Sequence, residues 1–374
     1  MARLGDICTR ITDGSHNPPQ GISHSEYLML SSKNIYYDEI TLDDPRFLSA
    51  ENYETENKRT QISTGDILLT IVGTVGRAAV VPNSIKNICL QRSVAVIKPK
   101  SDLVDSRFLM YQLQSMRTQL EQEARGVAQK GIYLKQVENL QIKVPSLDEQ
   151  LRVVKKLDKV SKLIALRKEQ LTKLDQLVKS RFIELFGDRY TNDKKWDNKP
   201  LYECADFYNG KAHEQVVDEN GEYILVTSRC IASDISDYRR TNALLFPLQV
   251  NDIAMVMSDV PNGRALAKCV LIDEDGKYTL NQRICCLRNY SFNPIFFYYL
   301  LNRHEYFLSF NDGNAQTNLR KDDLLACNII IPPMELQEQF AAFVEQTDKS
   351  KLAIQQSLDK LELLKKSLMQ EYFG

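Results

Sequence analysis

An internal repeat constrains this chain more than any other feature of its sequence. Short strings recur at a spacing of 187 residues, which is half of the 374-residue length. A tandem duplication with its boundary near Gly187 accounts for this spacing. The recurring strings are Ala128-Gln129 with Ala315-Gln316, Ile142-Lys143-Val144-Pro145 with Ile329-Ile330-Ile331-Pro332, Lys173-Leu174-Asp175 with Lys360-Leu361-Glu362 and, near the same offset, Gly76-Arg77 with Gly263-Arg264 and Gln91-Arg92 with Gln282-Arg283.

Each half begins with short, mixed signals of secondary structure. Residues 67–71, 78–81 and 93–97 are apolar runs of the length and composition of buried strands. The apolar residues that follow fall instead at helical spacing, at Leu109, Leu113, Met116 and Leu120. This mixture predicts an α/β region with many loops.

Each half ends with a long helical period. Apolar residues recur every seven positions from 146 to 186, the spacing of a coiled coil, at Leu157, Ile164, Leu171, Val178 and Leu185 with Val160 and Leu174 between them. Ser146-Leu147-Asp148-Glu149 fits a capping box at its start. Pro332-Pro333 starts the second helix, whose stripe is Phe340, Phe343, Ile354, Leu358, Leu361, Leu364 and Leu368.

Each helix should contain about 40 residues and extend roughly 60 Å. An exposed apolar stripe of that length needs cover, so we expect the two helices to pair, antiparallel, with the two α/β regions at opposite ends. The fold class is therefore α+β with an internal pseudo-two-fold repeat. The expected domains are residues 1–145 and 188–332, each α/β, with spacer helices at 146–187 and 333–374.

Composition excludes several classes of protein. With 48 basic and 49 acidic side chains the chain has no global basic field, so any nucleic-acid contact must come from local patches. Eight cysteines without a C-x-x-C pair, and four histidines, predict neither a disulfide framework nor a zinc site. The sequence has no secretory apolar run and no apolar stretch of membrane-spanning length, which predicts a cytoplasmic protein with no membrane contact.

Catalytic motifs are missing from the sequence. Asn17-Pro18-Pro19-Gln20 resembles the Asn-Pro-Pro-aromatic motif of amino-methyltransferases, but Gln20 cannot stack on a flipped base. No glycine-rich nucleotide-binding turn, Walker lysine motif or nucleophile elbow occurs. We therefore expect that the chain alone catalyses nothing and needs no cofactor.

Two variable α/β regions, each followed by a copy of a long helix, resemble the specificity subunit of type I restriction-modification enzymes. The resemblance covers the whole chain, and it rests on the order and duplication of motifs that are individually short. These motifs are Ile11-Thr12-Asp13-Gly14-Ser15-His16, Gly65-Asp66-Ile67-Leu68, Gly73-Thr74-Val75-Gly76-Arg77, and Leu147-Asp148-Glu149-Gln150 and Leu336-Gln337-Glu338-Gln339 at the helix starts.

The resemblance implies a function and a set of partners. In that family the α/β regions are target recognition domains for double-stranded DNA, and the helices form the spacer on which two methyltransferase (modification) subunits dock. Restriction subunits, with translocase and nuclease activity, are further partners that the family implies. The expected target is bipartite, with an unread gap set by helix length, and the partners carry out adenine methylation and DNA cleavage.

Comparing the two halves sorts the candidate DNA-binding residues. Residues shared by both halves should be scaffold or phosphate contacts, whereas divergent polar loop residues should read bases. The shared pairs are Arg77 with Arg264, Arg92 with Arg283, and Gln129 with Gln316. The divergent residues are Ser15, His16, Lys33 and Asn34 in the first half and Asn209, Lys211, Ser228 and Arg229 in the second.

Two other classes of function stay open at the level of sequence. One is a self-contained DNA methyltransferase or nuclease whose motifs have diverged. The other is a coiled-coil scaffold unrelated to DNA, which the near-neutral charge favours. Methyl transfer by the purified chain without a partner would indicate the first, and no binding to any duplex with a partner present would indicate the second.

Overall fold

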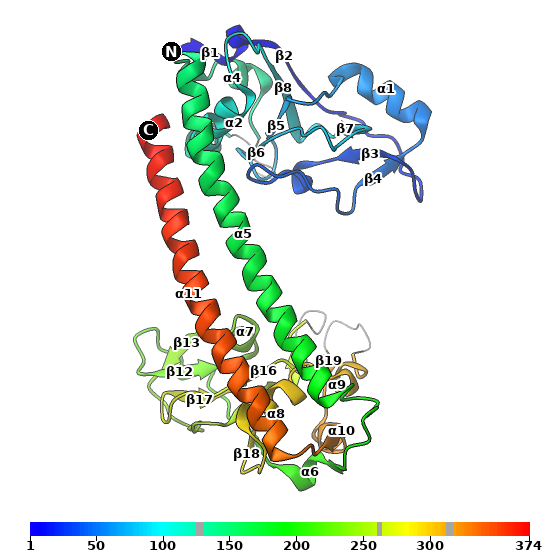
Figure 1. Cartoon of the computed structure of the whole chain (residues 1–374), viewed down its shortest axis with the longest axis vertical. Helices are drawn as coiled ribbons and strands as arrows, with labels where there is room; N and C mark the ends of the chain where they lie inside the picture. Colours follow the sequence, from blue (N-terminus) through cyan, green and yellow to red (C-terminus); the bar gives the residue numbers. More distant parts are fainter. Residues whose placement is uncertain (125–130, 260–263, 312–316) are drawn as a thin grey trace. The chain divides into compact units, whose positions relative to one another are not determined.

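The computed structural model describes residues 1–124, 131–259, 264–311 and 317–374. The chain divides into two compact units: unit 1 contains Met1–Lys168 and Gln356–Gly374, and unit 2 contains Glu169–Gln355. The division cuts both long helices, α5 (Leu147–Phe186) and α11 (Met334–Phe373). Each unit therefore combines one α/β region with one part of each helix (Figure 1).

The α/β regions repeat a similar order of elements. Unit 1 contains β1 (Ala2–Arg3), η1 (Leu4–Ile7), β2 (Cys8–Asp13), β3 (Tyr27–Leu30), η2 (Ser32–Asn34), β4 (Arg46–Leu48), α1 (Ala50–Thr60), β5 (Ile67–Thr70), β6 (Ala78–Val80), β7 (Ile88–Leu90), β8 (Val94–Pro99), α2 (Ser106–Ser115), α3 (Arg117–Glu123), α4 (Leu134–Glu138) and β9 (Gln141–Ile142). Unit 2 contains β10 (Asn198–Pro200), α6 (Leu201–Cys204), β11 (Asp206–Asn209), β12 (Tyr223–Val226), α7 (Ser228–Ala232), β13 (Arg239–Thr241), β14 (Ile253–Val256), β15 (Ser258–Asp259), β16 (Cys269–Leu271), β17 (Tyr278–Leu280), β18 (Ile284–Arg288), α8 (Pro294–Leu301), α9 (Glu305–Leu308), β19 (Thr317–Asn318), α10 (Lys321–Leu325) and β20 (Asn328–Ile330). Among the described residues, α1 is found only in unit 1, and the pair β15 and β19 only in unit 2.

Sheet topology is the same in both units. A four-stranded antiparallel sheet has the order β2-β8-β5-β6 in unit 1 and β11-β18-β14-β16 in unit 2. A three-stranded sheet, β4-β3-β7 or β13-β12-β17, contains one parallel pair, β3 with β7 or β12 with β17. This agreement, together with two 40-residue helices, bears out the duplication expected from the sequence.

The inner strands of the four-stranded sheet, such as β5 and β14, are buried on both faces, which explains their continuous apolar runs. In β5, Ile67 and Leu69 belong to the core that contains α2 and the start of α5, whereas Leu68 lies in the core beneath the three-stranded sheet. Alternate side chains of one strand thus fill two cores. The predicted strands 67–71, 78–81 and 93–97 correspond to β5, β6 and β8.

Two glycines hold the four-stranded sheet close to the three-stranded one. A Cβ atom on Gly14 would lie 2.1 Å from the carbonyl oxygen of Leu90, and one on Gly210 would lie 2.0 Å from that of Asn281. Each glycine precedes a residue in a parallel bridge, Ser15 with Gln91 and Lys211 with Asn281. Gly14 and Gly210 are therefore structural equivalents.

We expect Gly14→Ala and Gly210→Ala each to lower the free energy of unfolding by about 2–3 kcal/mol, because the added methyl group must displace backbone. Denaturant unfolding of the full chain measures this. Gly5→Ala is the matched control, since its Cβ would lie 3.5 Å from the nearest atom, an ordinary contact. Equal stability of all three variants would contradict the close approach.

Within each unit the two long helices run antiparallel. In unit 1, Lys156 Nζ donates to the Tyr372 hydroxyl at 2.9 Å, and Lys168 pairs with Glu362 at 3.0 Å. In unit 2, Asp175 pairs with Lys351 at 2.8 Å, and Phe182 packs on Phe340 at a centroid distance of 5.4 Å. In both units the number of the contacting residue falls along α11 as it rises along α5.

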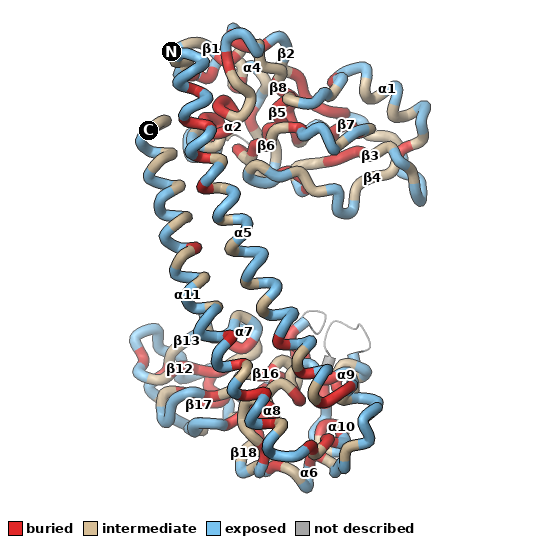
Figure 2. The backbone as a smooth tube through the Cα atoms, in the orientation of Figure 1, coloured by how far each residue is buried: buried red, intermediate tan, exposed pale blue. Residues whose placement is uncertain are grey.

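The seam between the helices is only partly apolar. Figure 2 shows that buried positions concentrate near the ends of α5, and none of the side chains at 161–177, all within the described part of the chain, is buried. The predicted stripe is wrong at Leu364, which is 45% exposed, whereas Lys365 beside it is half-buried. The aliphatic stem of Lys365 fills this position, and its ammonium lies over the Tyr111 ring at 5.7 Å.

A glutamine ties each long helix to its α/β region. Gln150 accepts a hydrogen bond from the amide of Asp105, which caps α2, and Gln337 accepts one from Asn293, which caps α8. Each glutamine also donates to a proline carbonyl at the helix start, Pro145 or Pro332. Gln150 and Gln337 therefore correspond, which places Gln150 opposite the second residue of Leu336-Gln337-Glu338-Gln339 rather than the last.

A buried histidine in unit 2 makes folding sensitive to pH. Burial first, and the nearby Arg189 guanidinium second, lower the pKa of His304 to about 4. The ring caps α9 by accepting from the amide of Tyr306 at 3.1 Å. The structure therefore holds this ring neutral.

Since the unfolded chain protonates this histidine near pH 6.5, its stabilising effect should be complete above that pH and decline toward pH 4, by up to about 3 kcal/mol. His304→Asn keeps a capping acceptor without a titrating group. The free energy of unfolding of the two proteins, compared from pH 7 to pH 4, should converge as pH falls. A constant difference would show that His304 does not titrate as expected.

No helix in the described part of the chain is both long and apolar enough to cross a membrane.

Candidate nucleic-acid interface

Polar residues gather in each unit where three strands end. β3 and β7 are parallel neighbours, so their carboxyl ends meet at one edge, and the chain continues there into 31–34 and 91–92. The amide of Gln91 donates to Leu30 at 2.9 Å, and that of Arg92 donates to the Ser15 carbonyl at 2.9 Å. The end of β2 joins them in this way. We call this the strand-end site of unit 1.

Unit 2 repeats this arrangement in the same register. Asn281 donates through its amide to Val226 at 3.1 Å, and Lys211 donates to Leu280 at 3.0 Å. The strand-end site of unit 2 therefore contains the residues that follow β11, β12 and β17. The equivalent positions in the two sites are Ser15 and Lys211, Lys33 and Arg229, Gln91 and Asn281, and Arg92 and Gln282, with Arg283 one residue further on.

One basic residue in each site is held by an aspartate. Lys33 pairs with Asp44, and Arg229 pairs with Asp237 at 2.6 Å. Both follow the N-cap residue of a short helix by two positions, Ser31 for η2 and Thr227 for α7. The sequence comparison placed both residues in divergent loops, yet the structure gives them one position, which fits a shared role.

Arg92, Arg283 and Lys211 are cations of these sites whose side chains have no partner among the described residues. Both arginine side chains are exposed, and neither guanidinium has a hydrogen-bond or ion-pair partner among the residues that the structure describes. Lys211 is likewise exposed, with only its backbone engaged. A free guanidinium at a fixed position can bind a phosphate or a base edge.

Arg283 lies between two hollows of unit 2, with volumes of about 350 and 400 Å³. The first is also lined by Ser228 and Arg229, and the second by Asn209. Four residues selected from the sequence are thus brought together. Arg239, which also lines the first hollow, is not predicted; its signal in the sequence is the adjacent pair of arginines at 239–240.

Two of the candidates for base reading in unit 1 are buried. Ser15 is 8% exposed and lies in the parallel bridge. Asn34 is 1% exposed, and its amide accepts from Ser31 and donates to the Asp43 carbonyl. Their placement corrects the expectation that they face a ligand, since a polar loop residue can serve the loop itself.

The remaining candidates of both units lie apart from these arginines or have internal contacts. His16 is half exposed and bonds Asp13 at 2.8 Å, and Asp13 also pairs with Arg59. Arg77 stacks over the Tyr36 ring at 5.1 Å, whereas Arg264 is exposed. Gln129 and Gln316 lie outside the described residues.

The cysteines of the chain lie where burial favours the neutral thiol. The eight cysteines are free, and burial raises the pKa of the thiols, to about 12 for Cys8 and Cys89 and to about 11 for Cys230, so they are held as unreactive thiols. Among the described residues, no three His, Cys, Asp or Glu side chains form a group that could hold a metal ion.

Comparison with known proteins places this chain among DNA specificity proteins. The type I restriction modification DNA specificity domain family matches twice, at residues 2–176 and 192–364. The EcoBI specificity subunit of Escherichia coli, a type I restriction enzyme subunit, is 30% identical over 169 residues, 44% of this chain and 35% of that protein. The chain thus spans about a third of that relative.

The MjaVIII specificity subunit of Methanocaldococcus jannaschii is similar over more of its length, 23% identical across 84% of this chain and 79% of that protein. Among solved structures, the S subunit of a type I restriction-modification system from M. genitalium superposes with a TM-score of 0.56 at 13% identity, covering all of this chain and 95% of that one. A chain solved for complex assembly and conformational transition of the type I R-M system gives 0.59 at 17% identity, with 100% and 96% covered. These structures support the fold.

Proposed function

The chain belongs to the type I restriction modification DNA specificity domain family, and on that premise we propose that it is the sequence-specific DNA-binding subunit of a type I restriction-modification complex. It would itself be non-catalytic. It would direct adenine methylation by two methyltransferase subunits, and cleavage by restriction subunits, to a bipartite target in double-stranded DNA. Its expected place is the cytoplasm.

The observation that carries the proposal is the repetition of the strand-end site in the same register in both units, each with an exposed arginine for which no described residue is a partner. Two copies of one strand-end site suit a target with two half-sites. The family match supports this, since each of its two matched segments contains one strand-end site.

We assign residues 1–145 and 188–332 to the two target recognition domains, and 146–187 and 333–374 to the spacer. The contacts proposed for phosphate or bases are those of Lys33, Arg92, Lys211, Arg229 and Arg283, with His16, Asn209, Ser228 and Arg264 as neighbours of the duplex. In this proposal Arg77 supports a loop, and Gln129 and Gln316 keep the scaffold or phosphate role expected from their repetition.

Methylation sequencing of DNA from cells that produce this chain with its methyltransferase partner tests the proposal. We expect methylated adenines in one bipartite motif, and loss of the motif when this chain is omitted. Methylation that persists without the chain, or that the purified chain performs alone with S-adenosylmethionine, would reject the non-catalytic assignment.

A further inference from the structure

Three consecutive residues of unit 1 are each held by a different arginine. Arg77 lies over the Tyr36 ring at 5.1 Å, Arg117 lies over the Tyr37 ring at 5.6 Å, and Arg107 bonds Asp38. The segment 36–38 follows η2 directly, and η2 contains Lys33 of the strand-end site. Whatever fixes this segment therefore also fixes one wall of the site.

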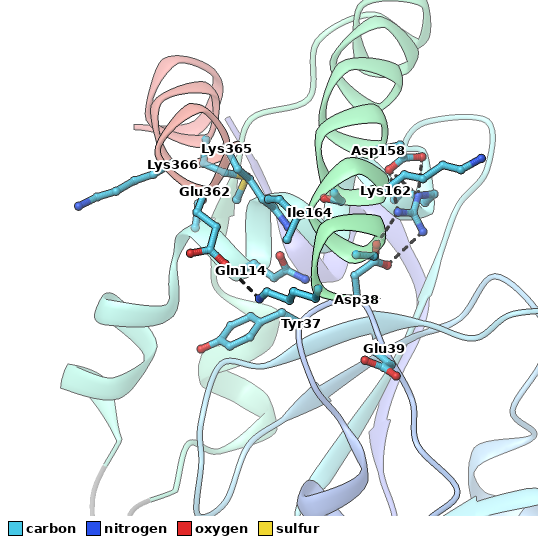
Figure 3. A pocket seen from close by; sticks show the side chains of 16 residues that line it. Tyr37, Asp38, Glu39, Gln114, Asp158, Lys162, Ile164, Glu362, Lys365 and Lys366 are labelled. Carbon is cyan, nitrogen blue, oxygen red and sulfur yellow. Dashed lines mark hydrogen bonds and ion pairs between the residues drawn. The ribbon is translucent and has the colours of Figure 1, made fainter. Parts of the chain in front are cut away.

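Arg107 differs from the other two arginines because it also reaches a long helix. Its Nη atoms donate to Asp38 at 3.1 and 2.6 Å, and its Nε donates to both oxygens of Asp158 at 2.9 Å. Asp158 lies on α5. Figure 3 shows Asp38 and Asp158 on either side of these bonds, in a groove of about 980 Å³ that unit 1 forms between the loop, α2, α5 and α11.

The link from Asp38 through Arg107 to Asp158 is held in place by further contacts. Arg107 is in the first turn of α2, whose cap Asp105 is itself bonded to Gln150. The Tyr111 hydroxyl, one turn further along, donates to Asp158 at 2.8 Å. Arg107 and Asp38 are 35% and 18% exposed, so their charges are partly withdrawn from water, where paired hydrogen bonds are strong and directional.

Unit 2 has a different side chain at the position of Arg107. Ile295 occupies the place of Arg107 on α8, because each follows its helix cap by two residues. Asp234, which like Asp38 has a positive φ, pairs with Lys268 at 2.8 Å. The aspartate of unit 2 is thus held by its own α/β region, without this arginine link to a long helix.

Building on the proposed function, we infer that Arg107 is a positioning residue that fixes the strand-end site of unit 1 relative to α5. By doing so it narrows the range of gap lengths, between the two half-sites, that the protein accepts. Arg107 contacts no base in this role. Its loss should therefore leave the half-site sequences unchanged and affect only the spacing between them. The arginine acts through Asp38, so removing either partner should have the same effect.

The test uses the full chain assembled with its methyltransferase partner and duplexes whose two half-sites are separated by the native gap or by one base pair more or less. We expect Arg107→Met and Asp38→Asn each to reduce the preference for the native gap by about tenfold, with half-site preferences retained. Arg117→Met is the matched control, since it removes a similarly exposed arginine that contacts the same segment, at Tyr37, without touching α5.

Unchanged gap preference in Arg107→Met and Asp38→Asn, with thermal unfolding that shows both to be folded, would overturn the inference. So would relaxed base preference in a half-site, which would make Arg107 a reading residue. A wild-type protein without any bipartite preference would instead overturn the proposed function, and the two failures are distinguished by the wild-type arm alone.

Discussion

Inserting seven residues into both long helices is expected to lengthen the gap between the methylated half-sites by about three base pairs. Seven helical residues add about 10 Å, and base pairs of B-DNA are about 3.4 Å apart. A seven-residue insertion also preserves the apolar period of the seam. Suitable points are between Lys168 and Glu169 in α5 and between Gln355 and Gln356 in α11, where the two units meet and no neighbouring side chain is buried.

Methylation of the native target should fall more than about 100-fold in this variant, since one half-site can no longer be contacted and each lost base contact costs about 1–3 kcal/mol. Methylation of a target with the longer gap should rise in this variant as methylation of the native target falls. Methylation sequencing detects both changes in one experiment. A seven-residue insertion between Glu219 and Asn220, in an exposed turn of unit 2, is the control and should leave the gap as it is.

If the variant with longer helices still methylates the native gap, the helices do not set the spacing, and the proposed spacer role fails. Insertion into α5 alone tests the packing of the two helices against each other. It would shift the apolar positions of one helix past those of the other, so we expect loss of assembly rather than a new gap.

Long-range regularities could be predicted from the sequence because many residues contribute to each of them. The repeat, the strands now seen as β5 and β8, and both 40-residue helices follow from periods that single substitutions do not erase. The antiparallel pairing within each unit follows from the need to cover two stripes. These features are decided by burial, which composition and spacing report directly.

Details set by a single contact could not be predicted. Asn34 and Lys33 are adjacent polar residues of the short helix η2, yet the first is buried with its own hydrogen bonds and the second is not. Gln150 and Gln337 correspond through their bonds to helix caps, whereas the strings around them suggest another register. Lys365 fills a seam position beside an exposed leucine. Local hydrogen bonding decides the first two cases, and contact of the Lys365 ammonium with the Tyr111 ring accompanies the third. Propensity describes none of these contacts.

The strand-end sites combine features that the sequence predicts with features that it does not. The sequence comparison selects Arg92 and Arg283 because they repeat, but it cannot show that strands from three parts of the chain end beside them. The parallel pairing of β3 with β7, and of β12 with β17, produces this convergence. Parallel pairing depends on residues about 60 positions apart, beyond any local signal.

Replacing both of these arginines by alanine is expected to weaken DNA binding by the assembled complex at every sequence alike. The structure corrects the pairing expected from the sequence, because Arg283 lies one position beyond the equivalent of Arg92. We assign both to phosphate contacts because each strand-end site still has one such exposed arginine, whereas the two half-sites need not share bases. Loss of both phosphate contacts should reduce the dependence of log K on log salt by about two, with affinity falling alike for specific and random duplexes. Binding titrations at several salt concentrations, on specific and random duplexes, measure both quantities.

The structure makes this pair of substitutions a clean probe, because neither guanidinium has an internal partner among the described residues. Stability should therefore change by less than about 0.5 kcal/mol, and lost binding cannot be attributed to unfolding. Arg10→Ala removes an exposed arginine of β2 away from the strand ends, and the salt dependence should be that of the wild type. If Arg92→Ala or Arg283→Ala instead relaxes one base of a half-site and leaves the salt slope intact, that arginine reads sequence, and the phosphate assignment fails in that unit.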